Sequence, residues 1–409
     1  MLISKVWVLD ITQTVNMLRI TAPLSWPFRA RLPTFLKLLL LTVFVSVALY
    51  VAFVPSLYLS YRKPLWHHQY RGVYPHLRNA MDSAHVVFIP HSYAPWSQYI
   101  VYRCDGTSAC GGWADRQKGI VAAYLISVMT ERKFKVILTV PCDIRTYLLP
   151  VKEDWRVHGN ELQGIPSTNV VKMDSVAASF CDRLGKEKLE DIFKSNVTYF
   201  NVNMECVQFL LRNPLYPRQL GWAKGMSVGE VYQVVWNSLF KLNQKTGNHL
   251  RTFRSQMSRS KTLVCSQIRV GKSPTIPQDR VINTLEHVEA VWSFLKKYND
   301  SNRYHIFLTT DSEQIRDIGR SKFPDVNLDL KGHIVHVDRT TGNHVCDGLE
   351  KTLLDQIILS TCDVLIISES GFGRIAAFMR RTQDNLYCLN VANITRCTEK
   401  SPEFIRGPW

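Results

Sequence analysis

Two short segments combine cationic, hydroxyl and glycine residues in patterns that suit the binding of an anion. Residues 267–273 (QIRVGKS) carry Arg269 and Lys272 on either side of a glycine, which lets the backbone approach a ligand closely. Residues 368–374 (SESGFGR) place Ser370 and two glycines before a helical pattern, where backbone N–H groups attract negative charge. Both segments follow runs of β-branched residues, so we expect both at the ends of strands.

Neither segment fits a familiar nucleotide-hydrolysing or serine-hydrolase motif. A P-loop that ended in Gly-Lys-Ser would need glycine at position 266, where the chain has Ser266. A nucleophile elbow centred on Ser370 would need glycines where Ser368 and Phe372 stand. The chain also has no Asp-x-Asp pair, no HExxH and no CxxC, so we expect no metal. Without a metal, the charge of a diphosphate must be met by Arg, Lys, hydroxyl and backbone N–H groups.

The elements that must position these segments alternate between strand and helix. This alternation predicts parallel sheets covered on both faces, with ligands beyond the carboxyl ends of the strands. The expected strands are residues 86–89, 99–102, 135–140, 262–268, 305–308, 334–337, 364–367 and 386–389. The expected helices are residues 115–130, 281–298, 312–322, 348–360 and 375–380. Residues 150–260 have a mixed pattern, in which we expect helices, loops and part of an acceptor surface.

An uncharged run of 22 residues, 38–59, precedes these elements. As a helix it would span about 33 Å, enough to cross a bilayer. A cleavable signal peptide and a buried core helix are the alternatives, and the length of the run and of the segment before it argues against both. We therefore expect a cytosolic tail (1–37), a transmembrane anchor (38–59) and a stem (60–83). The flanking basic residues balance, so they do not fix the orientation.

Cysteine placement favours a lumenal body. All ten cysteines follow the anchor, and an even number on one side of a membrane indicates disulfides in an oxidising compartment; buried free thiols are the alternative. Pairing cannot be deduced, although Cys104–Cys110 and Cys388–Cys397 would close short loops. Three N-glycosylation acceptors agree with this interpretation: Asn196, Asn299 and Asn393. Together these features predict a single-pass type II membrane protein with a short cytosolic tail and a large lumenal body.

Composition narrows the class of protein further. The chain has 409 residues, 46% of them hydrophobic, which excludes a disordered, collagen-like or coiled-coil protein and suggests two domains plus accessory segments. Its net charge of +16 points either to an anionic partner or to a generally basic surface. A nucleic-acid partner is not expected, because a lumenal protein meets little nucleic acid.

Three motifs, in order along residues 84–390, resemble those of the GDP-fucose-dependent fucosyltransferase superfamily, which includes the α1,2-, α1,6- and protein O-fucosyltransferases. Residues 110–120 (CGGWADRQKGI) resemble its first glycine-loop motif, and residues 268–271 (IRVG) resemble its basic motif. Residues 354–363, followed by Ser370 and Arg374, are similar to the C-terminal motif of the α1,6 branch. The resemblance implies a GT-B-like α/β fold of two Rossmann-like domains facing a cleft. Here these would be an acceptor-side domain (84–255) and a nucleotide-sugar-binding domain (256–409).

The resemblance also implies roles for individual residues. Arg269 would hold the diphosphate and stabilise it as it leaves, and Asp355 would contact guanine. The other implied donor-binding residues are Gly111, Gly112, Asp115, Arg116, Ser370, Gly371 and Phe372. An inverting transfer also needs a base near the acceptor, for which Asp311 is the candidate and Glu369 the second choice. Each of these residues also has a purely structural alternative, as a surface arginine, an ion-pair partner or a helix cap.

The chain departs from the family pattern at three positions. The basic motif usually begins with His and often carries an acid after its glycine, whereas this chain has Gln267 and Lys272 there. Asp115 stands where the first motif often has Asn.

The predicted function is the transfer of fucose from GDP-fucose to a hydroxyl of a glycan or glycoprotein, without a metal or other cofactor. Two alternatives remain open. One is a lumenal transferase that uses another anionic donor, either a different nucleotide sugar or a sulfate donor. The other is an inactive pseudo-transferase that binds glycans.

Overall fold

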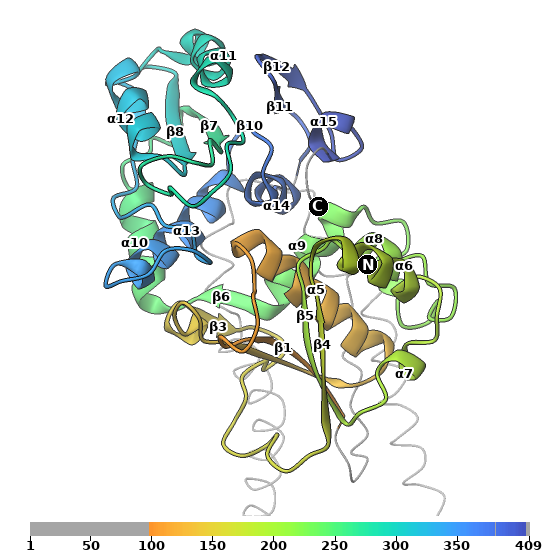
Figure 1. Ribbon diagram of the computed structural model, residues 1–409. Coiled ribbons are helices and arrows are strands. Elements are labelled where there is room, and N and C mark those ends of the chain that lie inside the picture. Colours follow the sequence, from red (N-terminus) through yellow and green to blue (C-terminus); the bar gives the residue numbers. More distant parts are fainter. Residues whose placement is uncertain (1–97, 381, 406–409) are drawn as a thin grey trace, which may run out of the picture. The chain divides into compact units, whose positions relative to one another are not determined.

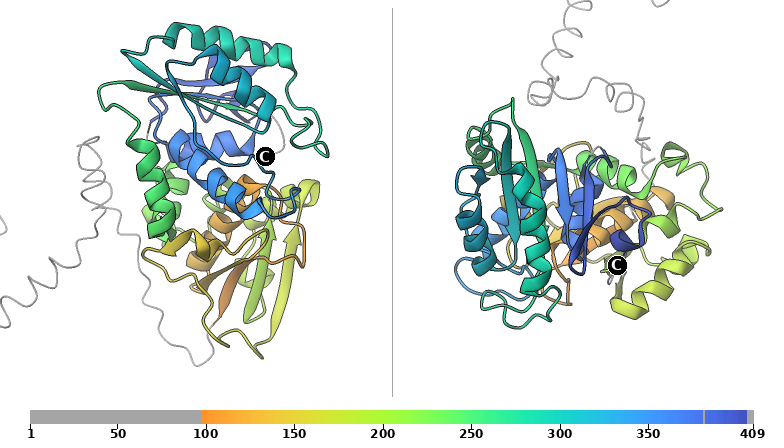
Figure 2. Two further views of the ribbon diagram at one scale, coloured as in Figure 1. Left: turned by 90° about the vertical axis from the view of Figure 1, so that its left-hand side faces the viewer. Right: turned by 90° about the horizontal axis from the view of Figure 1, so that it is seen from above.

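The computed structural model describes residues 98–380 and 382–405, all of which belong to one compact unit. The predicted tail, anchor, stem and 86–89 strand lie outside the described residues. Within the described part of the chain, no helix is long and apolar enough to cross a membrane. Two α/β layers make up this unit, each built on its own sheet, with helices of both layers packed between the sheets (Figures 1 and 2).

The N-terminal sheet has four strands in the order β2-β1-β5-β4, and every neighbouring pair is parallel. Its strands are β1 (Tyr99–Cys104), β2 (Lys133–Leu138), β4 (Ser167–Lys172) and β5 (Val197–Val202). Most residues of the two central strands are buried, as expected when both faces of a parallel sheet are covered. The first strand–loop–helix–strand unit predicted from the sequence is therefore confirmed.

Helix α5 (Trp113–Met129) joins β1 to β2 and is buried on nearly every side. This explains its almost continuous apolar sequence. Asp115 accepts a hydrogen bond from the Gly112 N–H (3.0 Å) and so starts the helix two residues before the predicted position. A side chain at Gly119 would come within 2.6 Å of the Tyr102 ring, because the helix lies directly on the sheet at that point.

The middle of the chain supplies further helices and a small antiparallel pair, β3 (Leu148–Pro150) with β6 (Phe240–Leu242). The helices are α6 (Asp174–Leu184), α7 (Leu189–Ile192), α8 (Val207–Leu210), α9 (Val228–Leu239) and α10 (Gln244–Arg254). Short 3₁₀ turns occupy Ile144–Thr146 and Gly221–Ala223.

The C-terminal sheet has six strands in the order β12-β11-β10-β7-β8-β9, and only β12 runs antiparallel to its neighbour. Its strands are β7 (Thr262–Ile268), β8 (Tyr304–Thr310), β9 (Asn327–Leu328), β10 (Val364–Ile367), β11 (Leu386–Asn390) and β12 (Asn393–Arg396). The helices of this half are α11 (Leu285–Leu295), α12 (Glu313–Lys322), α13 (Val345–Leu359), α14 (Gly371–Met379) and α15 (Pro402–Ile405), with a 3₁₀ turn at Lys296–Tyr298. The predicted α/β architecture with parallel sheets is confirmed.

Two sequence predictions in this half need correction. The predicted 281–298 helix begins only at Leu285, because Thr284 caps it by accepting a hydrogen bond from the His287 N–H. The predicted 334–337 strand is wrong, since residues 329–344 form no helix or strand and β9 takes the sheet edge instead. The apolar residues of that segment pack against helices; a side chain at Gly348 of α13 would lie 2.2 Å from Val335. Their alternation reflects this packing and not strand pairing.

Five disulfides use all ten cysteines, so the predicted disulfides are confirmed. Cys104–Cys110 and Cys388–Cys397 close the short loops that their spacing suggested. Cys142–Cys346 differs from the others because it joins the two halves across 204 residues of chain. Beside it, the Tyr147 hydroxyl donates to the Cys346 carbonyl (2.9 Å), which adds a second connection between the halves.

Candidate functional site

A cavity of about 620 Å³ lies where the carboxyl ends of strands from both sheets meet. Its walls are the loops that follow β1, β7, β8 and β10, together with the 329–344 segment. Ten of the site residues predicted from the sequence line it: Gly111, Gly112, Asp115, Arg269, Asp311, Asp355, Glu369, Ser370, Gly371 and Phe372. Its volume is in the usual range for a small-molecule site. The cavity therefore gathers segments that are far apart in the sequence.

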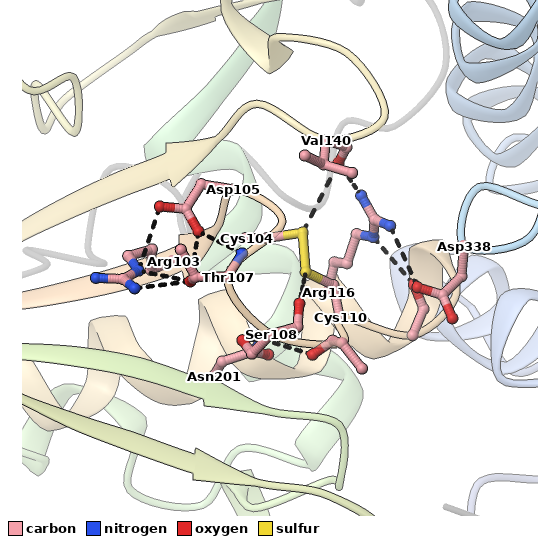
Figure 3. Close-up of a disulfide and its surroundings, with 12 residues drawn as sticks. Arg103, Cys104, Asp105, Thr107, Ser108, Cys110, Arg116, Val140, Asn201 and Asp338 are labelled. Atoms are coloured by element: carbon pink, nitrogen blue, oxygen red, sulfur yellow. Dashed lines mark hydrogen bonds and ion pairs between the residues drawn. A yellow bond between two sulfur atoms is a disulfide. The ribbon is translucent and has the colours of Figure 1, made fainter. Parts of the chain in front are cut away.

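The glycine loop between β1 and α5 is braced on both sides. The Cys104–Cys110 disulfide closes it at its base, and Asn201 of β5 donates to the Ala109 carbonyl (2.9 Å; Figure 3). Gly111 has a φ of +72°, and a Cβ at this position would lie 2.6 Å from the Asp115 carboxylate. Only glycine fits this turn without strain, and the loop can therefore pass tightly over the first turn of α5.

Asp115 lines the cavity, but its carboxylate is already engaged. One oxygen accepts the Gly112 N–H, and the other pairs with Lys118 (2.7 Å). Lys118 is itself buried and also lines the cavity. These contacts show that Asp115 orders the start of α5 and holds a cation beside the cavity.

Arg116 does not line the cavity, although it was predicted to contact the donor. Its side chain is 1% exposed and donates to the carbonyls of Gly111 (3.0 Å) and Val337 (3.2 Å). It also donates to the Val140 carbonyl (Figure 3). Asp338 lies 3.8 Å from the same guanidinium. Arg116 thus connects the glycine loop to the 329–344 segment of the other half.

Arg269, at the end of β7, lies between two acids on the cavity wall. Its guanidinium contacts Asp279 and lies 3.3 Å from Asp311. Its backbone is fixed as well, since its N–H donates to Ser368 Oγ (2.8 Å) and its carbonyl accepts from Asn283 (2.6 Å). The predicted diphosphate-binding arginine is therefore held at the cavity by side chains from several loops.

Asp311 supports the loop that carries Arg269. Its two oxygens accept the N–H groups of Val270 and Gly271, each at 2.8 Å. Burial raises its pKa, against the effect of Arg269 and these hydrogen bonds. It does not cap the next helix, because Ser312 is the N-cap of α12. The carboxylate predicted as a base thus lies in the cavity wall with both oxygens accepting hydrogen bonds.

The loop after β7 returns to the strand end because of Gly271. This residue has a φ of +79°, and a Cβ here would lie 1.9 Å from the Arg280 carbonyl. That carbonyl accepts the Lys272 N–H (2.9 Å), which closes the loop and brings Asp279 to Arg269. Lys272 itself is exposed and does not line the cavity.

The second anion-binding segment has the predicted helix-terminal geometry. Ser370 caps α14, and its hydroxyl accepts the Phe372 N–H (3.2 Å). A Cβ on Gly371 would lie 3.1 Å from the side chain of Ala114, so α14 begins close to the start of α5. Gln267, where the family usually has His, is buried, and its side-chain oxygen accepts from the Ser368 hydroxyl (3.3 Å).

Asp355 and Arg374, two further residues of the C-terminal motif, also reach the cavity. Asp355 pairs with Lys351 one helical turn away, with both N–O distances 2.9 Å, and burial raises its pKa. Arg374 is 1% exposed, and burial lowers its pKa to about 10, against the effect of Glu369 and Asp115. Both charged side chains are therefore buried in the wall of the cavity.

Sequence reasoning missed several residues of the cavity, above all Asp279, His336 and Arg339. Burial, aided by the nearby cations Arg269 and Arg339, lowers the pKa of His336 to about 4, so the ring is neutral at pH 7. His336 and Arg339 were hidden by the mistaken 334–337 strand. The polar stretch 336–344, which holds two histidines, an aspartate, an arginine and a glycine, was the available signal for a loop.

The net positive charge of the chain does not come from the residues that line the cavity. Six cationic and seven acidic side chains line it. Among them, the side chains of Asp279 and Asp311 are 4% and 8% exposed, whereas those of Arg269 and Arg339 are 21% and 39% exposed. The guanidinium groups are thus more exposed to the cavity than the carboxylates that pair with them. The cavity would favour an anion because of this difference in exposure and not because of its net charge.

The three glycosylation acceptors differ in exposure. Asn299 and Asn393 are exposed, and Asn196 is half-buried at the start of β5. Thr198, the third residue of the Asn196 acceptor, is completely buried in the sheet.

Searches by sequence find no matching family model and no matching curated protein. Among solved structures, the chain is similar to a mutant of Arabidopsis thaliana FUT1 in complex with GDP, at 13% identity over 78% of this chain and 76% of that one, with a TM-score of 0.53. It is also similar to the fucosyltransferase NodZ from Bradyrhizobium, at 13% identity over 73% of this chain and 98% of that one, with a TM-score of 0.47. The first likeness shows a shared fold, in agreement with the fold predicted from the motifs.

Proposed function

We propose that this protein is a glycosyltransferase that moves fucose from GDP-fucose to a hydroxyl of a glycan. One observation carries the proposal. Three motifs identified by resemblance, separated by more than eighty residues each, meet in one cavity of suitable size at the strand ends. The likeness in fold to a fucosyltransferase in complex with GDP supports the same donor.

The described residues suit the departure of a nucleoside diphosphate. Fucosyl transfer has an oxocarbenium-like transition state, as glycoside hydrolysis does, so negative charge builds on the leaving diphosphate. Arg269 would meet this charge with its guanidinium, and the N-terminus of α14 at Ser370 would meet it with backbone N–H groups. Because these donors are held in place before the ligand arrives, little reorganisation would be needed during the reaction.

The opposite wall would receive the acceptor. Met173, Asp174, Asn203 and Met204 come from the N-terminal half and line the same cavity. In this proposal the lumen of the Golgi is the site of action, behind a type II anchor. The five disulfides support an oxidising compartment.

The direct test incubates the purified full-length protein with radiolabelled GDP-fucose and an array of glycans, with and without EDTA. Arg269→Ala should lose most of the activity, whereas Arg183→Ala, which removes an exposed arginine paired with Glu187 on α6, should keep it. Labelled glycan produced equally by all three proteins would remove Arg269 from the mechanism. Thermal stabilisation by UDP or adenosine 3′,5′-bisphosphate, but not by GDP, would instead favour another donor.

A glycan-binding pseudo-transferase is the second candidate. It is favoured by the engagement of Asp311, the predicted base, whose two oxygens already accept backbone N–H groups. Such a protein would be stabilised by GDP or retained on glycans and yet form no labelled product.

A further inference from the structure

One buried carboxylate on the cavity wall holds two arginines. Asp279 contacts Arg269 Nη2 through Oδ2 and Arg339 Nη1 through Oδ1. Arg280 adds its backbone N–H to Oδ1 (2.9 Å). All three charged side chains line the cavity, but the carboxylate is 4% exposed while the arginines are 21% and 39% exposed. The two cations therefore face the cavity side by side with the acid behind them.

The position of Arg339 is built into the 329–344 segment. The Arg339 and Thr340 N–H groups both donate to the His336 carbonyl (2.9 and 2.8 Å), and the His336 N–H donates to the Thr340 hydroxyl (2.9 Å). This closed turn is joined to the N-terminal half by Arg116 at Val337. Arg339 is thus presented from a fixed turn and not from the end of an open loop.

We propose that Arg339 is a second phosphate-binding residue, and that Asp279 positions it beside Arg269 to make a clamp that selects a diphosphate over a monophosphate. The inference rests on the proposed function, whose nucleotide it specifies further. A guanidinium is a planar fork that matches the oxygens of one phosphate group. Two forks fixed to one carboxylate can engage two adjacent phosphate groups, whereas a monophosphate can satisfy only one of them.

The local charges favour the same ligand. Asp279 and Asp311 balance the charge of the two arginines, so the guanidiniums can lie close together without net repulsion before a ligand binds. Burial acts to raise the pKa of Asp279, but the charge of Arg269 and the hydrogen bonds from Arg339 and Arg280 together outweigh burial. The pKa of Asp279 is therefore lowered. The carboxylate therefore stays ionised and keeps both arginines oriented at neutral pH.

The test measures binding of GDP and GMP by isothermal titration calorimetry to the full-length protein. The wild type should bind GDP at least about tenfold more tightly than GMP, since hydrogen bonds to charged groups contribute about 1.5–3 kcal/mol. Arg339→Gln should weaken GDP binding by about 10- to 100-fold and change GMP binding by less than about threefold. Arg339→Lys should give an intermediate loss of GDP affinity. Asp279→Asn should also lower the preference for GDP over GMP. Arg183→Gln, on the surface of α6, is the matched control.

The outcomes separate the two proposals. If the wild type binds no GDP, the proposed function fails together with the inference. If it binds GDP and Arg339→Gln does so equally well, the clamp is wrong while the proposed function stands. An equal loss for GDP and GMP would also overturn the clamp, because a structural role for Arg339 predicts that result. If Arg339→Gln does not fold, the test of the clamp uses Arg339→Lys and the ratio of the GDP and GMP affinities of the wild type. A wild-type ratio near one overturns the clamp.

Discussion

Trp113, in the first turn of α5, donates from its indole Nε1–H to the side-chain oxygen of Gln356 on α13 (2.9 Å). The same oxygen accepts from Gln117 (2.8 Å), and Gln356 donates back to the Gln117 oxygen (2.9 Å). All three side chains are buried. Helices α5 and α13, which both contribute residues to the cavity lining, are therefore joined across the two halves by a closed polar network.

Gln356→Ala should destabilise the protein by about 2–4 kcal/mol, because it leaves buried donors of Trp113 and Gln117 without their acceptor. The midpoint temperature of thermal unfolding should then fall by several degrees. Gln163→Ala, at an exposed turn, is the control and should change the free energy of unfolding by less than about 0.5 kcal/mol. Equal stability of the two variants would mean that the network contributes little to joining the halves.

Gly271→Ala should be more damaging than a glycine substitution elsewhere with the same backbone conformation. Both Gly271 (φ +79°) and Gly225 (φ +81°) would carry the strain of a positive φ, about 1 kcal/mol. Only at Gly271 would the new Cβ meet backbone, at 1.9 Å from the Arg280 carbonyl; at Gly225 nothing lies within 4 Å. Relief of this clash must move the loop that carries Asp279, so we expect Gly271→Ala to weaken GDP binding at least about tenfold while Gly225→Ala leaves it unchanged. Calorimetry on both variants makes the comparison, and equal affinities would contradict it.

His336 should make the protein less stable in mild acid. Its pKa is lowered by burial to about 4 in the folded state, below the ordinary value of 6.5. The unfolded chain therefore binds the proton first, so this contribution is complete above pH 6.5 and is lost as the pH falls towards 4. The loss should reach about 2–3 kcal/mol.

Urea unfolding of the wild type and His336→Gln at pH 7 and pH 5 isolates this effect, because the carboxylates titrate in both proteins. The variant should show a smaller fall in unfolding free energy between the two pH values. Parallel decreases would show that His336 is not the titrating group.

Removal of the Cys142–Cys346 disulfide should cost more stability than removal of Cys388–Cys397. By the chain-entropy argument, the 204-residue separation contributes about 5 kcal/mol and the nine-residue separation about 2–3 kcal/mol. Double Cys→Ser variants of each pair, unfolded in urea, test the order. Because Cys346 follows the turn that carries Arg339, only the first variant should also bind GDP more weakly.

Much of the architecture could be predicted from the sequence because strand–helix alternation is strong. The bounds of β7 and β10 match the prediction, since both strands are buried and contain apolar runs, 263–265 and 364–367. The 334–337 strand was wrong because an extended loop that packs on helices has the same alternation of apolar residues. The observed start of a helix differs from the predicted one where a capping residue, such as Thr284, sets the first helical turn within a longer stretch of helical periodicity.

The site could be predicted only where residues follow a strand directly. Arg269 and Ser370 are of this kind, and both line the cavity. Asp279 and Arg339 come from long loops whose paths depend on Gly271 and on contacts with the other half, and local sequence does not encode these. Arg116 is the converse case: it adjoins the glycine loop in sequence, but its guanidinium turns away into the joint between the halves.

The buried Thr198 has a consequence for how the polypeptide matures. An oligosaccharyltransferase must reach the threonine hydroxyl as well as Asn196, and in the finished sheet that hydroxyl has no exposed surface. Sugar at Asn196 would therefore have to be attached to the nascent chain before β5 takes its place, whereas Asn299 and Asn393 stay within reach afterwards. The fraction of molecules that carry a glycan at Asn196 would thus depend on how quickly the N-terminal sheet forms during synthesis.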